Sequence, residues 1–275
     1  MKTGKVGLFT IALGLVLGLL LVVRLVFIPS SEEQAQPLGK AVINEEIANV
    51  VPDFAAIKDV SEKKRAFFDF LRPSIKHQNA IIQGERDFLI EIKKQLINGK
   101  ELTEADEFRL QQISEKYQYT LRSLTLNNID TLLERVDIIP EQMVLIQAAN
   151  ETGWGSSRFA KEGLNFFGQW CFRKGCGLVP QSRTEGLSHE VALFKTVEDS
   201  VASYMRNLNS NAAYSLLRSI RADLRAQNKT PQAQDLVYGL INYSERQEAY
   251  IDELLEMLRQ NQRFLVDNNE KTTAA

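Results

Sequence analysis

One carboxylate of this chain stands where it could hold its proton near neutral pH. Glu151 lies at the end of an apolar helical pattern, directly before the corner Gly153-Trp154-Gly155. The C-terminal end of a helix carries partial negative charge, and the Trp154 indole could shield the carboxyl from water. Both effects raise a carboxyl pKa, and a protonated carboxylic acid is the general acid that glycoside hydrolysis requires. The alternative from spacing alone is a surface residue at a helix end.

Polar residues gather around Glu151 on this otherwise apolar helix. Gln147 lies four residues earlier and shares its helix face, and Asn150 is adjacent in sequence. Such breaks in a hydrophobic pattern are expected at functional sites. Competing chemistries lack their motifs, because the sequence has no glycine-rich phosphate loop followed by Lys-Ser/Thr and no Gly-x-Ser-x-Gly elbow.

The elements that must position Glu151 are predicted from local patterns. Pro140 suits the first turn of its helix, and Gly153 ends it. The segments 165–172 and 190–194 are rich in Val, Phe and Trp, which predicts a β-hairpin or small β-lobe.

Helical periodicity dominates the rest. The pattern of residues 61–120 predicts a charged helical hairpin, and Pro73 is expected to kink or restart its first helix. We expect this hairpin to be a stalk or a packing module. Further helices are expected over 125–136, from the Thr196 cap onward, over 212–226, from Thr230-Pro231, and from a capping box at Ser244 and Gln247.

The N-terminal segment is apolar enough to cross a bilayer. Residues 6–28 are nearly free of charge, and Lys2 and Lys5 before them favour an inside N-terminus. The alternative is a cleaved signal peptide, whose apolar region would be shorter and would end at a small-residue site. Either reading places the rest of the chain outside the cytoplasm, and an uncleaved anchor predicts a single-pass inner-membrane protein with a periplasmic catalytic domain. The expected organisation is a short cytoplasmic end (1–5), an anchor (6–28), a linker (29–60), the helical stalk or packing module (61–124), the main domain (125–262) and a disordered tail (263–275).

Charge and cysteine content exclude several functions. The 275 residues have a formal net charge of −2, and we see no basic patch with interleaved aromatic residues, so a nucleic-acid partner is not expected. Cys171 and Cys176 are candidates for a disulfide that closes a small loop, and two free thiols are the alternative. A zinc site would need more ligands than the two histidines, His77 and His189, supply nearby in sequence. No metal or other cofactor is expected.

Two motifs in order resemble a known family. The run Gln147 to Gly155, followed by Asn165-Phe166-Phe167-Gly168, resembles the signature of the N-acetylglucosaminidase domain of glycoside hydrolase family seventy-three. The stretch 165–180 and Tyr243-Ser244-Glu245-Arg246 are similar to the Bax-type bacterial members of that family. The resemblance covers about residues 125–262. It departs from the usual pattern at Gln169-Trp170, where the family has a lysine-bearing ending, and in the added Cys171–Cys176 loop.

The resemblance implies roles for individual residues. Glu151 aligns with the catalytic acid, and Tyr243 aligns with a tyrosine that helps to hold the N-acetyl group of the sugar. A second carboxylate, where the family requires one, comes from the β-lobe, where Glu190 and Glu185 are the choices and Glu198 is a weaker one. Residues beside the site are candidates for substrate binding, with core packing as the alternative for the aromatic ones: Gln147, Trp154, Asn165, Phe167 and Trp170.

The resemblance also implies the fold and the activity. The expected fold is mainly α, lysozyme-like, with a helical lobe and a small β-lobe. The expected reaction is hydrolysis of the β-1,4 bond after N-acetylglucosamine in peptidoglycan, with Glu151 as general acid. The alternatives are a non-catalytic, membrane-tethered peptidoglycan-binding or scaffold protein, and a lytic transglycosylase.

Overall fold

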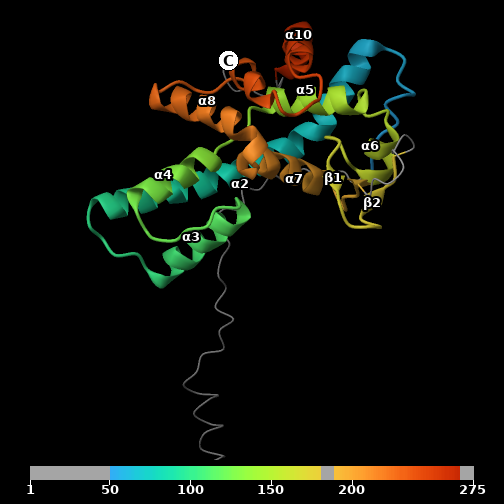
Figure 1. Cartoon of the computed structure of the whole chain (residues 1–275). Helices are drawn as coiled ribbons and strands as arrows, with labels where there is room; N and C mark the ends of the chain where they lie inside the picture. The colour runs from blue at the N-terminus through green and yellow to red at the C-terminus, as the bar shows by residue number, and fades with distance from the viewer. Residues whose placement is uncertain (1–49, 181–188, 267–275) are drawn as a thin grey trace, which may run out of the picture. The chain divides into compact units, whose positions relative to one another are not determined.

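The computed structural model describes residues 50–180 and 189–266, and most of these residues lie in helices (Figure 1). The predicted mainly α class is confirmed, whereas residues 6–28, the expected membrane anchor, lie outside the described residues. Within the described part of the chain, no helix combines the length and the apolarity needed to span a bilayer. The elements in order are α2 (Val60–Ile97), α3 (Glu104–Lys116), α4 (Leu126–Arg135), α5 (Glu141–Thr152), α6 (Arg158–Gly163), β1 (Trp170–Cys171), β2 (Gly177–Leu178), β3 (Glu190–Ala192), α7 (Val197–Ser210), the 3-10 turn η1 (Ala212–Tyr214), α8 (Ser215–Ala226), α9 (Ala233–Leu236), the 3-10 turn η2 (Val237–Leu240) and α10 (Glu248–Leu265).

The longest helix, α2, is part of the same core as the predicted main domain. Asp59 caps it by accepting from the Glu62 backbone N–H at 2.7 Å, and the helix then continues through Pro73. Of the two expectations for Pro73, a kink or a restart, the restart is wrong, because buried residues on both sides, Leu71 and Ile75, hold one continuous helix against its neighbours. It contacts α4, α5, α7 and α10, so residues 60–97 and the main domain share one hydrophobic core.

The helix that carries Glu151, α5, is enclosed almost completely. Met143 to Ala149 are all buried, and α5 contacts α2, α9 and α10. Pro140 is its N-cap residue, and Gly153 ends it in the left-handed conformation, so the predicted start and stop are confirmed. After this buried stretch, the polar residues Asn150 and Glu151 are partly exposed at the C-terminal end of the helix.

The β-lobe is smaller than predicted. Three short antiparallel strands pair in the order β1-β3-β2, with Trp170 and Leu178 both opposite Val191. α6 contacts β2 and β3 (Figure 1). Residues 165–169, expected as strand, form a tight turn instead, for a reason that lies in the Asn165 side chain (below).

The C-terminal helices differ from the predicted caps. α10 starts at Glu248 after Gln247, whose φ is +47°, and no side chain caps it, so the expected capping box from Ser244 is wrong. It ends only at Leu265, inside the segment expected as a tail, because Phe264 and Leu265 are buried. Residues 267–275 lie outside the described residues.

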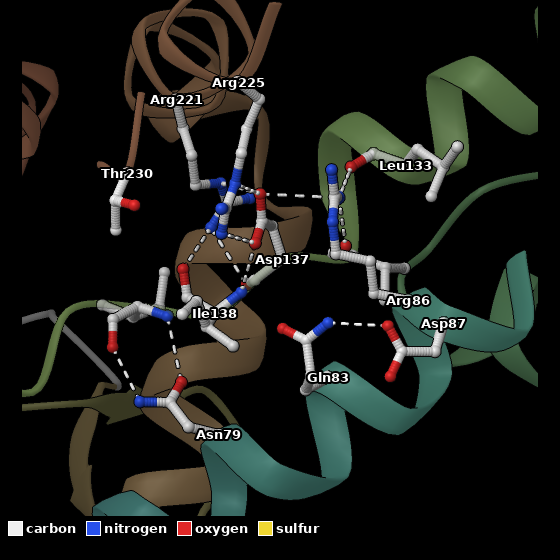
Figure 2. A network of polar contacts seen from close by, with 12 residues as sticks. Asn79, Gln83, Arg86, Asp87, Leu133, Asp137, Ile138, Arg221, Arg225 and Thr230 are labelled. Carbon is white, nitrogen blue, oxygen red and sulfur yellow. Dashed lines mark hydrogen bonds and ion pairs between the residues drawn. The ribbon is translucent and has the colours of Figure 1, made fainter. Parts of the chain in front are cut away.

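A buried ionic network ties α2, α8 and the α4–α5 connection together (Figure 2). Asp137 is 2% exposed and binds Arg225 through both carboxylate oxygens, at 2.9 and 3.0 Å. Arg86 lies 3.4 Å and Arg221 3.9 Å from the same carboxylate, which also accepts the Ile138 backbone N–H at 2.9 Å. One anion thus joins three guanidinium groups from two helices.

Candidate active site

The corner after α5 is built from three consecutive left-handed residues. Gly153, Trp154 and Gly155 have φ values of +54°, +61° and +75°. A Cβ on Gly155 would lie 2.5 Å from Phe54 Cδ2, so only glycine permits this close approach. The corner turns the chain away at once and leaves Glu151 at the rim of the core.

The indole of Trp154 packs against α2. Its ring centroid lies 5.9 Å from that of Phe67 and 5.3 Å from that of Phe68, and Lys64 Nζ lies 4.9 Å over the indole. Trp154 is half-buried. A segment that precedes the family-like region therefore supports the corner that follows Glu151.

The Glu151 carboxyl is half-buried and has a hydroxyl donor. Tyr250 Oη donates to Glu151 Oε1 at 2.9 Å. Burial raises the pKa of Glu151, nearby Glu253 adds to this, and the Tyr250 hydrogen bond and the charge of Arg246 act in the opposite direction. The predicted direction of the pKa shift is confirmed, and its largest cause is removal of the carboxyl from water.

A turn faces the second oxygen of this carboxyl. Asn165 Oδ1 accepts the backbone N–H groups of Phe167 and Gln169, and its amide donates to the carbonyls of Gln169 and Ala192. This turn puts Gly168, with φ of +61°, beside Glu151, where an added Cβ would lie 3.5 Å from Glu151 Oε2. The Asn165 side chain is 1% exposed and fully used, which corrects its expected role in substrate binding and explains why these residues form no strand.

Gln147 also lies beneath the site rather than in it. It is 0% exposed, accepts from Tyr204 Oη through Oε1, and donates from Nε2 to Tyr250 Oη at 3.0 Å. A side chain that is closed off from solvent cannot touch a sugar, so its expected contact with substrate is corrected. It instead connects α7, α5 and α10 through three side chains.

Tyr243 and Phe167 are packed together beside this cluster. Phe167 is 2% exposed and stacks on Tyr204 with ring centroids 4.0 Å apart, so it is a core residue and not a sugar contact. Tyr243 is half-buried, stacks on Tyr250, and donates its hydroxyl hydrogen to the Phe167 carbonyl at 2.7 Å. Burial raises its pKa, with the Glu151 charge adding to the effect, so its hydroxyl stays neutral. With its hydrogen engaged, the Tyr243 oxygen can only accept from a ligand.

Glu190 has a structural task in the β-lobe. It is 4% exposed, and its two oxygens accept the backbone N–H groups of Gly175 at 3.0 Å and Gly177 at 2.8 Å. It thereby holds the loop that the disulfide Cys171–Cys176 closes. The three side chains Cys171, Cys176 and Glu190 lie within 4.8 Å of one another, but sulfurs bonded to each other are not thiolate ligands for a metal.

The expectation that Glu190 is the second catalytic carboxylate is therefore corrected, because a buried anion held by two backbone N–H groups does not face substrate. Glu198 accepts from Gln78 at 2.7 Å and pairs with His77 at 2.6 Å, so it too is used within the fold. Glu185 lies outside the described residues.

Trp170 remains available on the surface of the β-lobe. It is 57% exposed, and one face stacks on the His189 ring with centroids 4.3 Å apart. An exposed indole held in a fixed orientation can stack on a sugar ring.

Two buried tyrosines were not anticipated as parts of the site. Tyr204 and Tyr250 fall at apolar positions of their helices, as core residues do, and each is at most 2% exposed. Nothing in the local sequence distinguishes them from other core tyrosines, because their hydroxyl partners lie 57 and 99 residues away.

A half-buried carboxylic acid with a raised pKa, held by one hydroxyl at a helix end, is a group that can donate a proton. The profile of the glucosaminidase family, described as mannosyl-glycoprotein endo-beta-N-acetylglucosaminidase, matches residues 126–263. The chain belongs to this glucosaminidase family, as a Bax-type member of glycoside hydrolase family seventy-three.

The chain is also similar to a curated bacterial protein. It is 35% identical to Protein bax of Escherichia coli (strain K12) over 219 residues, which cover 78% of this chain and 76% of that relative. No solved structure matches. Family membership supports a glycoside hydrolase with a glycan, such as peptidoglycan, as substrate class.

Proposed function

We propose that this protein hydrolyses the β-1,4 glycosidic bond after N-acetylglucosamine in peptidoglycan, with Glu151 as general acid. The observation that carries the proposal is the Glu151 carboxyl, whose pKa is raised by burial and which lies inside the family-matched region. A carboxyl in this state is protonated to higher pH than an exposed glutamate, and it can donate its proton to the leaving oxygen.

The positive charge that develops on the sugar needs a partner. Because Glu190 is engaged by backbone N–H groups, the remaining candidates are Glu185 and the substrate's own N-acetyl oxygen. Tyr243 supports the second route, since its hydroxyl oxygen can accept the acetamido N–H and hold that group in place. Trp170, which is 57% exposed on the β-lobe, is the indole that we assign to stacking on a neighbouring sugar.

Zymography on purified peptidoglycan tests the proposal. Glu151→Gln should lower the rate of reducing-sugar release by roughly a thousandfold, within the range that general acid catalysis contributes. Glu190→Gln is the matched variant, and it should lose less than about tenfold because it loosens a loop without removing the acid. Equal clearing by wild type and Glu151→Gln would remove Glu151 from the mechanism.

Two further outcomes separate the alternatives. Anhydro-sugar products in mass spectrometry would identify a lytic transglycosylase, whereas binding to sacculi without any bond cleavage would identify a scaffold protein. If Glu185→Gln keeps near wild-type activity, the N-acetyl oxygen is the partner of the sugar cation.

We further propose that residues 6–28 anchor the chain in the inner membrane and place the catalytic domain in the periplasm. The apolar run in the sequence and the Cys171–Cys176 disulfide, which is typical of an oxidising compartment, support this. The full-length chain should fractionate with membranes and resist alkaline carbonate extraction. Its release by carbonate, or its recovery in the soluble fraction as a shortened chain, would contradict an anchor.

A further inference from the structure

Three buried side chains form a line that ends at Glu151. Tyr204 on α7 donates to Gln147 on α5, Gln147 donates to Tyr250 on α10, and Tyr250 donates to Glu151. The first three residues are 1%, 0% and 2% exposed, so none of them reaches a substrate. Burial raises the pKa of both tyrosines, and their hydroxyl groups therefore remain donors.

The direction of each hydrogen bond follows from the donors available. A phenol has one hydrogen, and an amide has a donor end and an acceptor end. The Tyr204 hydroxyl occupies the oxygen of Gln147, so the amide turns its NH₂ group toward Tyr250. Because the Tyr250 oxygen accepts from that group, its single hydrogen is directed to Glu151 Oε1.

We infer that Gln147 and Tyr204 are positioning residues for the catalytic acid, because together they direct the Tyr250 hydrogen to Oε1 of Glu151 and leave the transferable proton on Oε2. Oε1 then accepts in both protonation states, while Oε2 faces the side of Gly168. This inference rests on the proposed role of Glu151.

The pH dependence of full-length protein separates this role from simple core packing. Tyr250→Phe removes a donor to the carboxylate, so the pKa of Glu151 should rise by about one unit. The alkaline limb of the rate of sugar release from sacculi should move up by the same amount. In Tyr204→Phe the ring and its stacking on Phe167 remain, but the amide of Gln147 can flip and compete for the Tyr250 hydrogen. This variant should shift the limb in the same direction by a smaller amount.

Tyr214→Phe is the matched control. Tyr214 is a buried tyrosine of the same cluster, but its hydroxyl bonds Asn207 and not Gln147. The alkaline limb of the pH–rate profile of Tyr214→Phe should stay at the wild-type position. Because Tyr204 acts only through Tyr250, the double variant Tyr204→Phe/Tyr250→Phe should shift no further than Tyr250→Phe alone. Both single variants should lower kcat more than they change KM, since neither side chain touches substrate.

A titration without substrate keeps the inference separate from the proposed function. The carboxyl carbon of Glu151, assigned by its loss in Glu151→Gln, is followed by NMR in protein labelled with ¹³C at glutamate. If wild type cleaves no glycan, the proposed hydrolysis fails, yet the titration midpoint still reports on the hydrogen-bonded line. An unchanged midpoint in Tyr204→Phe, or additive shifts in the double variant, would overturn the inference. Should Tyr204→Phe fold poorly, Gln147→Met removes both polar ends at similar length. Without the amide N–H on its oxygen, the Tyr250 hydroxyl donates more weakly, so the midpoint should rise by less than in Tyr250→Phe, and an unchanged midpoint would overturn the inference.

Discussion

Two buried carboxyl groups of this protein have opposite surroundings. Asp137 is 2% exposed, and its charge is matched by three guanidinium groups and a backbone N–H. Glu151 is half-buried, its direct hydrogen-bond donor is the neutral Tyr250 hydroxyl, and burial raises its pKa. Both acids flank α5, one before its first turn and one in its last turn.

The difference shows what burial alone does to an acid. Removal from water penalises the anion in both places. At Asp137 three guanidinium groups lie against the carboxylate, whereas at Glu151 the Tyr250 hydrogen bond and the charge of Arg246 offset only part of the penalty. Arg225 and Arg86 are held against that carboxylate, and burial lowers the pKa of Arg221 only to about 10, so its charge persists at neutral pH. Asp137 is therefore a fully paired carboxylate that joins helices, whereas Glu151 has a pKa raised by burial and can exchange a proton.

The largest effect on stability is expected at Asp137. Asp137→Asn leaves the buried Arg221 and the partly buried Arg86 and Arg225 without their carboxylate partner, and it should lower the free energy of unfolding by about 3–5 kcal/mol. Denaturant unfolding measures this. Asp130→Asn is the control, since Asp130 is 46% exposed and pairs with Lys93 at the surface, and it should cost about 1 kcal/mol or less.

The pH–rate profile of Asp137→Asn shows whether the substitution affects stability alone. At a temperature where Asp137→Asn is still folded, its pH–rate profile should coincide with that of wild type, because Asp137 is remote from the proton transfer. A stability equal to that of wild type would mean that the arginines find other partners, and the network would then be no determinant of the fold.

Local patterns predicted the elements that carry these acids, but not their partners. The helix from Pro140 to Gly153 and the Thr196 cap depend on residues a few positions apart, and both are confirmed. By contrast, Asp137 meets Arg225 across 88 residues and Glu151 meets Tyr250 across 99. Such pairs depend on how helices pack, which periodicity does not encode.

The same limit explains the errors at the site. The polar residue Gln147 on an apolar helix was rightly seen as unusual, but its partners lie on α7 and α10 and keep it buried. The resemblance makes Glu190 a candidate for the second carboxylate, yet the backbone of the neighbouring loop donates to both of its oxygens. Residue type and position drew attention to both side chains, but their roles follow from how the helices and the loop pack around them.

A smaller effect follows from the pH dependence of stability. The pKa of Glu151 is raised in the folded state above its ordinary value of 4.5. At a pH between the unfolded-state pKa and the higher folded-state pKa, the folded protein therefore binds more protons than the unfolded chain. Stability therefore falls as pH rises through this window. Glu151→Gln removes the penalty, and it should match wild type in acid and become more stable toward neutral pH.

Denaturant unfolding of both proteins from about pH 4 to about pH 8 shows whether the difference in free energy of unfolding between Glu151→Gln and wild type grows in this way. Glu190→Gln sharpens the contrast, because it loses an anion that accepts two backbone N–H groups and should be less stable than wild type at neutral pH. A gap between Glu151→Gln and wild type that stays constant over the whole range would contradict a raised Glu151 pKa.

The smallest effect is expected at Gly168, and it concerns the oxygen that carries the proton. Gly168→Ala must hold a side chain at φ of +61°, which costs about 1–2 kcal/mol, and it places a methyl group 3.5 Å from Glu151 Oε2. The methyl group excludes water from that oxygen, so the alkaline limb of activity should move up slightly and the rate should fall severalfold.

Gly99→Ala separates the backbone strain from the effect on the carboxyl. Gly99 has φ of +65°, and an added Cβ there meets nothing within 4 Å, so this variant should lose similar stability while it keeps the wild-type pH–rate profile. If Gly168→Ala also keeps that profile, Oε2 does not depend on the space beside Gly168, and the proton must leave Glu151 in another direction. If only Gly168→Ala shifts the limb, the difference between the two alanines isolates the surroundings of one oxygen, which is the feature that distinguishes Glu151 from the fully paired Asp137.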